Sequence, residues 1–347
     1  MAEKRKLKLA FLSYYSGLVN RGVETFVHEL ANALNRLGHD VIVFQGGGKL
    51  KRCKYKTKTI KIKGDRGLKS TIRRFTLYSL KDMDRDVDII YPTNGGWQSV
   101  LCRLWTWKNG KKLVISGQSG LGRDDKINLL TFPDCFVALT KNQKKWAKKQ
   151  NRFVRIKVIP NGVDLRKFDK SIKPIDLNLP RPVVLNVSAF VDWKRQELLV
   201  RAVAKLGVGS LLLVGSGPEK EKLNMLCEKL MPNRYKITSY PYHKMPAVYP
   251  AADVFSFPTV SWESFGIVML EAMASGLPIV ATNDPIRAEI IGRAGILVDP
   301  TNTDAYVQAL RTALDKNWGD LPRKQAEKYS WEKIALKYED LFYLIKK

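Results

Sequence analysis

The sequence is poor in cysteine and histidine, and it has no long hydrophobic run. Its three histidines are scattered, which argues against a catalytic triad or a zinc site. Its cysteines lie far apart and form neither a zinc-type nor a thioredoxin-type pair, so we expect reduced thiols in a cytoplasmic protein. The four are Cys53, Cys102, Cys135 and Cys227.

Apolar stretches long enough to cross a membrane are missing as well. A transmembrane helix needs about 18 or more consecutive apolar residues, and no such stretch occurs in the chain. The apolar run at residues 9–12 is too short for the core of a signal peptide and is predicted to be a strand. Any membrane contact is therefore expected to be peripheral, on the inner face of the membrane.

Acidic residues are scarce in one half of the chain only. Residues 1–170 hold 37 Lys and Arg against 14 Asp and Glu, a net charge of +23, whereas residues 171–347 hold 23 against 19, a net charge of +4. Twelve of the basic residues lie between Lys49 and Arg74, where Lys54, Lys56 and Lys58 alternate as on one face of a strand. An anionic membrane surface or another polyanion is the expected partner, and a plain solvated surface is the alternative. Nucleic acid is not expected, because no zinc-finger, RNP-type or basic-zipper sequence is present.

What the chain does contain is a regular alternation of strand-like and helix-like patterns. Helical patterns such as 24–37, 197–206 and 327–344 alternate with short β-branched runs, which predicts parallel sheets covered on both faces. With 347 residues, 45% of them hydrophobic, the chain exceeds what one core usually supports, so two α/β domains are expected. The predicted strands are 7–14, 41–45, 89–91, 113–116, 135–139, 157–159, 183–188, 210–214, 235–239, 254–258, 278–281 and 295–298.

The strongest chemical signal is the segment from Glu263 to Gly276, which follows the predicted strand 254–258. We expect this segment to open a helix. The free amide groups of Ser264, Phe265 and Gly266 would then form an anion site that suits a phosphate.

Glu263 and Glu271 are eight positions apart, and on one helix they would lie within about 80° of each other. One carboxylate would then meet a sugar and the other a ribose. Apolar residues flank Glu271 on both sides, where an unpaired carboxylate is costly, and this favours a binding role over a solvated surface position.

Two weaker signals concern phosphate binding. Lys194 lies just before the predicted helix 197–206, where it would neutralise a departing diphosphate, although an ordinary surface lysine is the alternative. Gly22 joins the first predicted strand to the first predicted helix and would let the backbone approach a phosphate or a sugar closely.

Together these segments resemble the glycosyltransferases of family 4, also called glycosyl transferases group 1. The resemblance covers nearly the whole chain and implies the GT-B architecture, with two facing Rossmann-like domains and a cleft between them. It rests on Gly22-Val23-Glu24, Pro160-Asn161-Gly162-Val163-Asp164, residues 187–194, Leu213-Val214-Gly215-Ser216-Gly217-Pro218 and, most specifically, Glu263 to Gly276.

The resemblance implies a retaining, metal-independent enzyme without a cofactor. It would move a hexose from a nucleotide-diphosphate sugar to a glycan or lipid-linked acceptor in envelope or surface polysaccharide synthesis. In the family's pattern Glu263 contacts the donor sugar, Glu271 takes the ribose hydroxyls, and Lys194 holds the phosphate. The implied domains are an acceptor domain at 1–165, a nucleotide-sugar domain at 166–326, and a helix at 327–347 that crosses back onto the first domain.

The chain departs from the family at two positions. Ala189 stands where many members have an arginine, five residues before Lys194, and Gln118 stands where many have a histidine over the sugar. Gln118 would hydrogen-bond a hydroxyl without carrying a proton at neutral pH, and we keep it as a candidate catalytic residue with Lys194 and Glu263. A non-catalytic sugar- or polyanion-binding protein, or a nucleotide-sugar epimerase or hydrolase, is the alternative function.

Two further segments have competing interpretations. The run Asp84-Arg85-Asp86 matches the metal-holding signature of other glycosyltransferases, but it stands in a charged loop before a strand, and no metal role is expected.

If residues 97–105 form a helix, one face of it carries Trp97, Leu101, Leu104 and Trp105. We favour a buried helix on the sheet, and a lipid-binding surface is the alternative.

Overall fold

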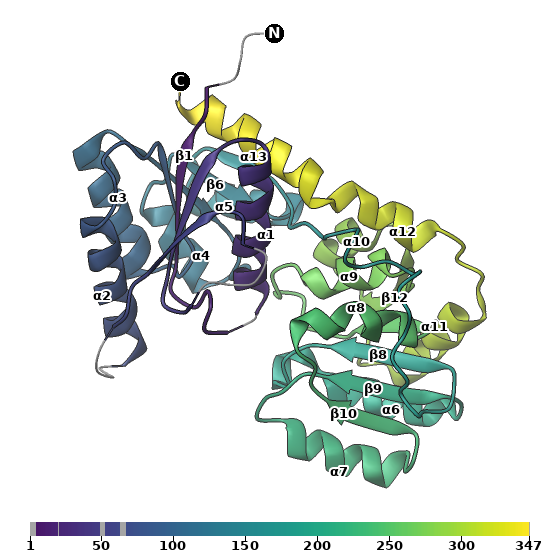
Figure 1. Ribbon diagram of the computed structural model, residues 1–347. Helices are drawn as coiled ribbons and strands as arrows, with labels where there is room; N and C mark the ends of the chain where they lie inside the picture. The colour runs from purple at the N-terminus through teal and green to yellow at the C-terminus, as the bar shows by residue number, and fades with distance from the viewer. Residues whose placement is uncertain (1–4, 20, 49–52, 63–66, 347) are drawn as a thin grey trace. The chain divides into compact units, whose positions relative to one another are not determined.

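The computed structural model describes residues 5–19, 21–48, 53–62 and 67–346 (Figure 1). The chain divides into two compact units. Unit 1 is Met1–Asn161 with Trp331–Lys347, and unit 2 is Gly162–Ser330. The expected boundaries at residues 165 and 326 each differ from these by four residues. No helix in the described ranges is long and apolar enough to cross a membrane.

Unit 1 contains a seven-stranded parallel sheet in the order β3-β2-β1-β4-β5-β6-β7. The order reverses between β1 and β4, the place where Rossmann-type sheets open a binding crevice at the carboxyl ends of their strands. The strands are β1 Lys8–Ser13, β2 Asp40–Gln45, β3 Lys56–Thr59, β4 Ile89–Pro92, β5 Lys112–Ser116, β6 Cys135–Ala138 and β7 Ile156–Val158. Its helices are α1 Gly22–Arg36, α2 Leu68–Lys81, α3 Trp97–Asn109, α4 Arg123–Leu130, α5 Lys141–Gln150 and α13 Trp331–Lys346.

Unit 2 repeats the arrangement with six parallel strands in the order β10-β9-β8-β11-β12-β13. The strands are β8 Val183–Val187, β9 Ser210–Val214, β10 Tyr235–Thr238, β11 Val254–Phe257, β12 Ile279–Thr282 and β13 Gly295–Val298. The helices are α6 Gln196–Leu206, α7 Lys220–Leu230, α8 Met245–Val248, α9 Ile267–Ala274, α10 Pro285–Ile291, α11 Thr303–Asp315 and α12 Leu321–Ala326. Short 3₁₀ turns are η1 Asp192–Lys194, η2 Tyr242–Lys244, η3 Tyr249–Ala251 and η4 Glu327–Tyr329.

These two doubly wound sheets confirm the predicted fold class. Every predicted strand coincides with an observed one to within two residues, because the buried strands of parallel sheets are continuous runs of β-branched and other apolar residues. The strand that the sequence did not predict is β3, Lys-Thr-Lys-Thr. It is an edge strand that pairs with β2 and has no apolar run. The last helix begins at Trp331 rather than at residue 327, because η4 and the extended Ser330 precede it.

The basic segment is only partly a positive face. Residues 49–52 and 63–66 of it lie outside the described ranges. On β3, the amines of Lys56 and Lys58 form ion pairs with Asp40 at 3.0 Å and Asp82 at 3.1 Å. Lysines on an edge strand also prevent pairing with another chain, so part of this pattern has a structural reason.

The helix α3 does not present the single face that the sequence predicted. Leu101 and Trp105 pack against the core of unit 1, whereas Trp97 and Leu104 are 58% and 55% exposed. The favoured interpretation, a buried helix, is therefore right for one half of this set and wrong for the other.

The helix α13 completes the core of unit 1 by packing against α1. The ring of Trp331 lies 6.0 Å from that of Phe26, and the hydroxyls of Tyr338 and Tyr91 are 3.1 Å apart. Tyr338 and Trp331 are both almost fully buried. The last segment of the chain is thus an integral part of the first unit's core.

We predict that Trp331→Ala lowers the free energy of unfolding by about 3–5 kcal/mol, because it removes a large buried ring and leaves a cavity. The matched control is Leu336→Ala on the same helix, whose side chain is 48% exposed and should change stability by no more than about 0.5 kcal/mol. Chemical denaturation of both variants measures this. Equal effects would show that α13 does not close the core.

Candidate active site

Two loops at the carboxyl edge of the second sheet hold two of the three candidate catalytic residues together. Lys194 is in η1, after β8, and Glu263 is in the loop after β11. The Nζ atom of Lys194 lies 2.8 Å from Oε2 of Glu263, with the two side chains only 14% and 19% exposed. The structure therefore brings these two predicted residues into one partly buried ion pair. The ammonium group also lies 5.1 Å from the ring centroid of Phe257.

The loop that carries Lys194 is held by the glycines that follow β9. A Cβ atom on Gly215 would lie 1.9 Å from the carbonyl oxygen of Ser188, and one on Gly217 would lie 2.3 Å from that of Phe190. The amide of Phe190 donates to the carbonyl of Ser216 at 2.8 Å. Glycine is required here so that the two loops can touch.

The loop that carries Glu263 is anchored by a fully buried arginine. The guanidinium of Arg287 donates to the carbonyls of Glu263 at 3.1 Å and Val260 at 2.8 Å, and its Nε atom donates to Asp284 at 2.6 Å. Asp284 also caps the amino end of α10 by accepting from the amides of Ile286 and Arg287. One ion pair therefore fixes the position of the loop backbone around Glu263.

The predicted helix of residues 263–276 is shorter than expected, and this corrects the geometry of the pair of glutamates. The helix α9 begins at Ile267, because Gly266 adopts a left-handed φ of 83°. Ser264, Phe265 and Gly266 therefore precede the helix, and Glu263 does not share its wheel with Glu271. The side chain of Phe265 is 2% exposed, so only its backbone is available to a ligand.

Glu271 lies on α9 and is buried in a tyrosine pocket. Its Oε2 accepts from the hydroxyl of Tyr249 at 2.6 Å and its Oε1 from that of Tyr242 at 3.1 Å. The ammonium of Lys167 lies 3.6 Å from the ring centroid of Tyr242. Burial raises the pKa of Glu271 above its ordinary value, against the opposing effect of the two tyrosine hydrogen bonds and the charge of Lys167.

The remaining candidates belong to unit 1. Gln118 follows β5 and exchanges two hydrogen bonds with Asn161, Nε2 to Oδ1 at 3.0 Å and Nδ2 to Oε1 at 3.2 Å. The neighbouring Gly117 carbonyl accepts from Gln143 at 2.8 Å. Gln143 also donates to Asp125, whose pKa burial raises to about 8. Gly22 is the first residue of α1, at the carboxyl edge of the same sheet.

The departure from the family pattern at Ala189 removes a positive charge near Lys194. Ala189 offers no charge, and the neighbouring Arg195 adopts a left-handed φ of 54°. Hydrogen bonds from Thr301 lower the pKa of Asp299, which follows β13, and the charge of Arg195 lowers it further.

The aspartates of residues 84–88 lie before β4, at the amino edge of the first sheet. Asp86 pairs with Lys8, and Asp88 accepts from the amide of Lys8 at 2.9 Å and from Lys346 at 2.6 Å. These contacts give the run a structural role. Across the described residues, no group of three or more His, Cys, Asp or Glu side chains is arranged to hold a metal ion.

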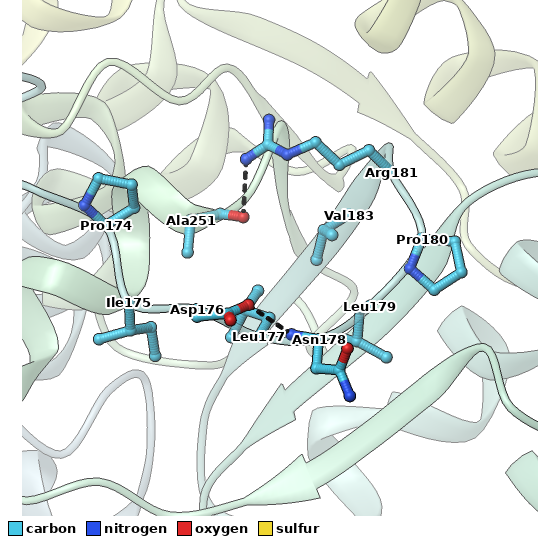
Figure 2. A pocket seen from close by; sticks show the side chains of 10 residues that line it. All are labelled: Pro174, Ile175, Asp176, Leu177, Asn178, Leu179, Pro180, Arg181, Val183 and Ala251. Atoms are coloured by element: carbon cyan, nitrogen blue, oxygen red, sulfur yellow. Dashed lines mark hydrogen bonds between the residues drawn. The ribbon is translucent and has the colours of Figure 1, made fainter.

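A separate cavity of about 580 Å³ lies at the amino edge of the second sheet, next to the start of β8 (Figure 2). It is lined by residues 174–181, Val183 and Ala251, and the guanidinium of Arg181 points to the carbonyl of Ala251 at 3.0 Å. Because Lys194 and Glu263 follow the carboxyl ends of β8 and β11, this cavity is not part of the candidate site.

Sequence reasoning missed several residues that build the site. Arg287, Asp284, Tyr242, Tyr249 and Lys167 were not predicted. The Asp-Pro pair at 284–285 signals a helix start, and an arginine three residues later is a recognisable partner for the cap. The tyrosines carry no such signal, because they are ordinary aromatic residues until the fold places them on Glu271.

Comparisons with known proteins agree with this architecture. The family model described as Glycosyltransferase Family 4 matches residues 20–167, and the one described as Glycosyl transferases group 1 matches residues 167–331. The structure of Anabaena Alr3699/HepE in complex with UDP and glucose superposes with a TM-score of 0.80 at 19% identity, over 97% of this chain and 100% of that one. Such a likeness shows the fold.

Curated relatives match over a shorter stretch. Sulfoquinovosyl transferase SQD2 of Arabidopsis thaliana is 32% identical over 193 residues, 51% of this chain and 37% of that protein. A D-inositol 3-phosphate glycosyltransferase of Corynebacterium jeikeium is 32% identical over 209 residues, 52% of this chain and 49% of that protein. The matched part of the chain thus spans about half, or less, of the length of these relatives.

The two doubly wound sheets, together with the likeness to HepE, define a protein with the GT-B fold. Since the two family models together match residues 20–331, the chain belongs to the family 4 glycosyltransferases.

We predict that Arg287→Met lowers the free energy of unfolding by about 3–5 kcal/mol, because it leaves the Asp284 carboxylate and two carbonyls buried without their partner. The control is Lys170→Met, which breaks the exposed ion pair with Asp320 and should change stability by no more than about 1 kcal/mol. Urea unfolding of both variants tests this. A small effect of Arg287→Met would show that the loop is held by other contacts.

Proposed function

We propose that the protein is a retaining, metal-independent hexosyltransferase that uses a nucleotide-diphosphate sugar. The observation that carries the proposal is the partly buried pair of Lys194 and Glu263, 2.8 Å apart at the carboxyl edge of the second sheet. The structural neighbours include HepE in complex with UDP and glucose, which supports a nucleotide-sugar donor for this chain.

Lys194 supplies the charge that the leaving group needs. In the proposed reaction the diphosphate of the donor takes the place of Glu263 beside the Lys194 ammonium. A fixed cation in a partly buried site stabilises negative charge that develops on the leaving oxygen, and it does so without reorganisation. The amino end of α9, which begins at Ile267, adds a second favourable field.

Glu263 and Glu271 then hold the two ends of the donor. Once the diphosphate has replaced the Glu263 carboxylate beside Lys194, that carboxylate accepts hydrogen bonds from hydroxyls of the donor sugar. Glu271 accepts from the ribose in place of Tyr242, whose hydroxyl is its longer contact at 3.1 Å, while the buried Tyr249 stays at 2.6 Å. The tyrosine pocket keeps the carboxylate oriented for this exchange.

The transfer step needs no protein base in this proposal. The bond from the sugar's anomeric carbon to the phosphate oxygen breaks, the acceptor oxygen bonds to the same face of that carbon, and the acceptor proton moves to the leaving phosphate. Gln118 orients a hydroxyl by hydrogen bonding, which is all that an amide is able to do at neutral pH.

The experiment is thermal unfolding with UDP, GDP, ADP and their sugars, in wild-type protein and in Glu271→Gln. A ligand at a hundredfold its dissociation constant raises the free energy of unfolding by about 2.7 kcal/mol. We expect one nucleotide to stabilise the wild type. We expect its affinity to fall by about tenfold or more in the variant, because an amide replaces a charged hydrogen-bond acceptor.

The same variant controls for a structural effect. Because burial raises the pKa of Glu271, the folded state binds that proton more tightly than the unfolded chain, and the wild type loses stability as pH rises through this raised value. Glu271→Gln lacks this loss, so we expect it to be at least as stable as wild type at pH 7, with its advantage shrinking towards pH 4. A strongly destabilised variant at pH 7 would contradict the binding role.

The alternatives give different results. A nucleotide-sugar epimerase or hydrolase would form product from the stabilising donor without any acceptor. A non-catalytic binding protein would bind the donor and form no product with lipid or glycan extracts. If no nucleotide stabilises the wild type, the proposed donor site is wrong.

For the acceptor, we propose a glycan or a lipid-linked sugar in envelope or surface polysaccharide synthesis, reached on an anionic membrane surface at its cytoplasmic face. The supporting surface is the outer side of α2 and α3, which pack against each other (Figure 1). Exposed apolar side chains stand among basic ones there, and Arg73 lies 5.7 Å from the ring centroid of Trp97. The exposed apolar residues are Leu77, Tyr78, Trp97, Leu104 and Trp107, and the exposed basic ones are Lys69, Arg73, Lys81 and Lys108.

We predict that the double variant Trp97→Ser/Trp107→Ser binds vesicles of phosphatidylglycerol and phosphatidylcholine about tenfold more weakly than wild type, because two interfacial indoles are lost. Met225→Ser, at an exposed apolar position of α7, is the control and should bind as wild type does. Vesicle sedimentation at low and high salt measures this, with weaker binding at high salt. Unchanged binding of the double variant would rule out this surface.

A further inference from the structure

Two exposed tryptophans flank the candidate active site. Trp193 directly precedes Lys194, and Trp262 directly precedes Glu263. Their ring centroids are 6.3 Å apart with an interplanar angle of 39°, and the residues are 41% and 54% exposed. Two loops that are far apart in the sequence therefore present neighbouring indole rings to solvent.

This pair is held in place by the backbone. The carbonyl of Trp193 accepts from the amide of Val260 at 3.1 Å and from the hydroxyl of Thr259 at 3.2 Å. The carbonyl of Val260 in turn accepts from the buried Arg287. The two rings thus belong to loops that are already fixed to each other, which reduces the entropy that a ligand would lose on binding them.

The position of the rings relative to the ion pair suggests what they bind. The side chains of Lys194 and Glu263 are 14% and 19% exposed, whereas both tryptophans are much more exposed. A ring that rests on the indoles would lie on the solvent side of the residues that take the donor's diphosphate and sugar. In the proposed function Glu271 takes the nucleotide end of the donor and Glu263 its sugar, and because Trp262 directly precedes Glu263, the tryptophan pair would lie at the sugar end of the reaction.

We propose that Trp193 and Trp262 form an aromatic platform for a pyranose ring of the acceptor, which makes the acceptor class a saccharide. This rests on the proposed function. A pyranose has an apolar face of axial C–H groups that packs on an indole, and such contacts combine apolar burial with aromatic geometry. Its hydroxyls remain at the rim, where the exposed Asp192 and Ser261 flank the rings and offer polar partners.

The test uses saturation-transfer NMR with methyl pyranosides of glucose, galactose and mannose, each measured with and without the nucleotide that stabilises the protein. We expect transfer to the axial C–H protons of at least one glycoside in the wild type. We expect affinity about tenfold weaker in Trp193→Ala and in Trp262→Ala, with partial recovery in Trp262→Phe. Phe153→Ala removes an exposed aromatic ring, 76% exposed, from unit 1 and should leave binding unchanged.

The outcomes separate this inference from the proposed function. Nucleotide stabilisation with no glycoside binding, or with glycoside binding that survives both alanine variants, overturns the platform and leaves the donor site intact. Loss of nucleotide-sugar affinity relative to the bare nucleotide in the tryptophan variants would assign the rings to the donor sugar and also overturn it. Glycoside binding that depends on both rings supports it, whether or not a nucleotide binds.

Discussion

The geometry of the second unit depends on one buried charge, the guanidinium of Arg287. It bonds to Asp284, to the carbonyls of Val260 and Glu263, and through the Val260 amide the same loop binds the carbonyl of Trp193. The cap of α10, the loop after β11 and the loop after β8 are thereby joined. A buried cation of this kind is tolerated only when all its partners are present, which makes the arrangement rigid.

The buried charge of Glu271, unlike that of Arg287, is only partly compensated by its partners in the tyrosine pocket. Burial on an apolar helix raises the pKa of the Glu271 carboxyl, so its charged form lowers stability at neutral pH. Two tyrosine hydroxyls and the charge of Lys167 reduce that penalty without removing it. The proposed ribose contact explains why a glutamate stands where a neutral residue would be more stable, since sites that bind polar ligands commonly trade stability for binding.

The two units have different electrostatic characters that suit different tasks. The first half of the chain carries a net charge of +23 and the second half +4. On β3 part of the positive charge is neutralised by Asp40 and Asp82, whereas on α2 and α3 basic residues surround exposed indoles. The second unit keeps its key cation, Lys194, paired and partly buried. The first half of the chain thus has a large excess of positive charge, whereas the second half is nearly balanced and holds one partly buried lysine at the candidate site.

The sequence alone determined the α/β class and nearly all of the strands, because these depend on local hydrophobic pattern, and it singled out the segment from Glu263 to Gly276 as a candidate site by its spacing. It placed α9 too early and put Glu263 on the helix, because the left-handed conformation of Gly266 is not visible in a helical pattern. It missed β3, whose strand pairing supplies what its own residues lack. Only the tertiary structure brought Arg287, Tyr249 and Trp262 to the site, because contacts between loops from different strands depend on how the sheet arranges their carboxyl ends, and no local pattern records that.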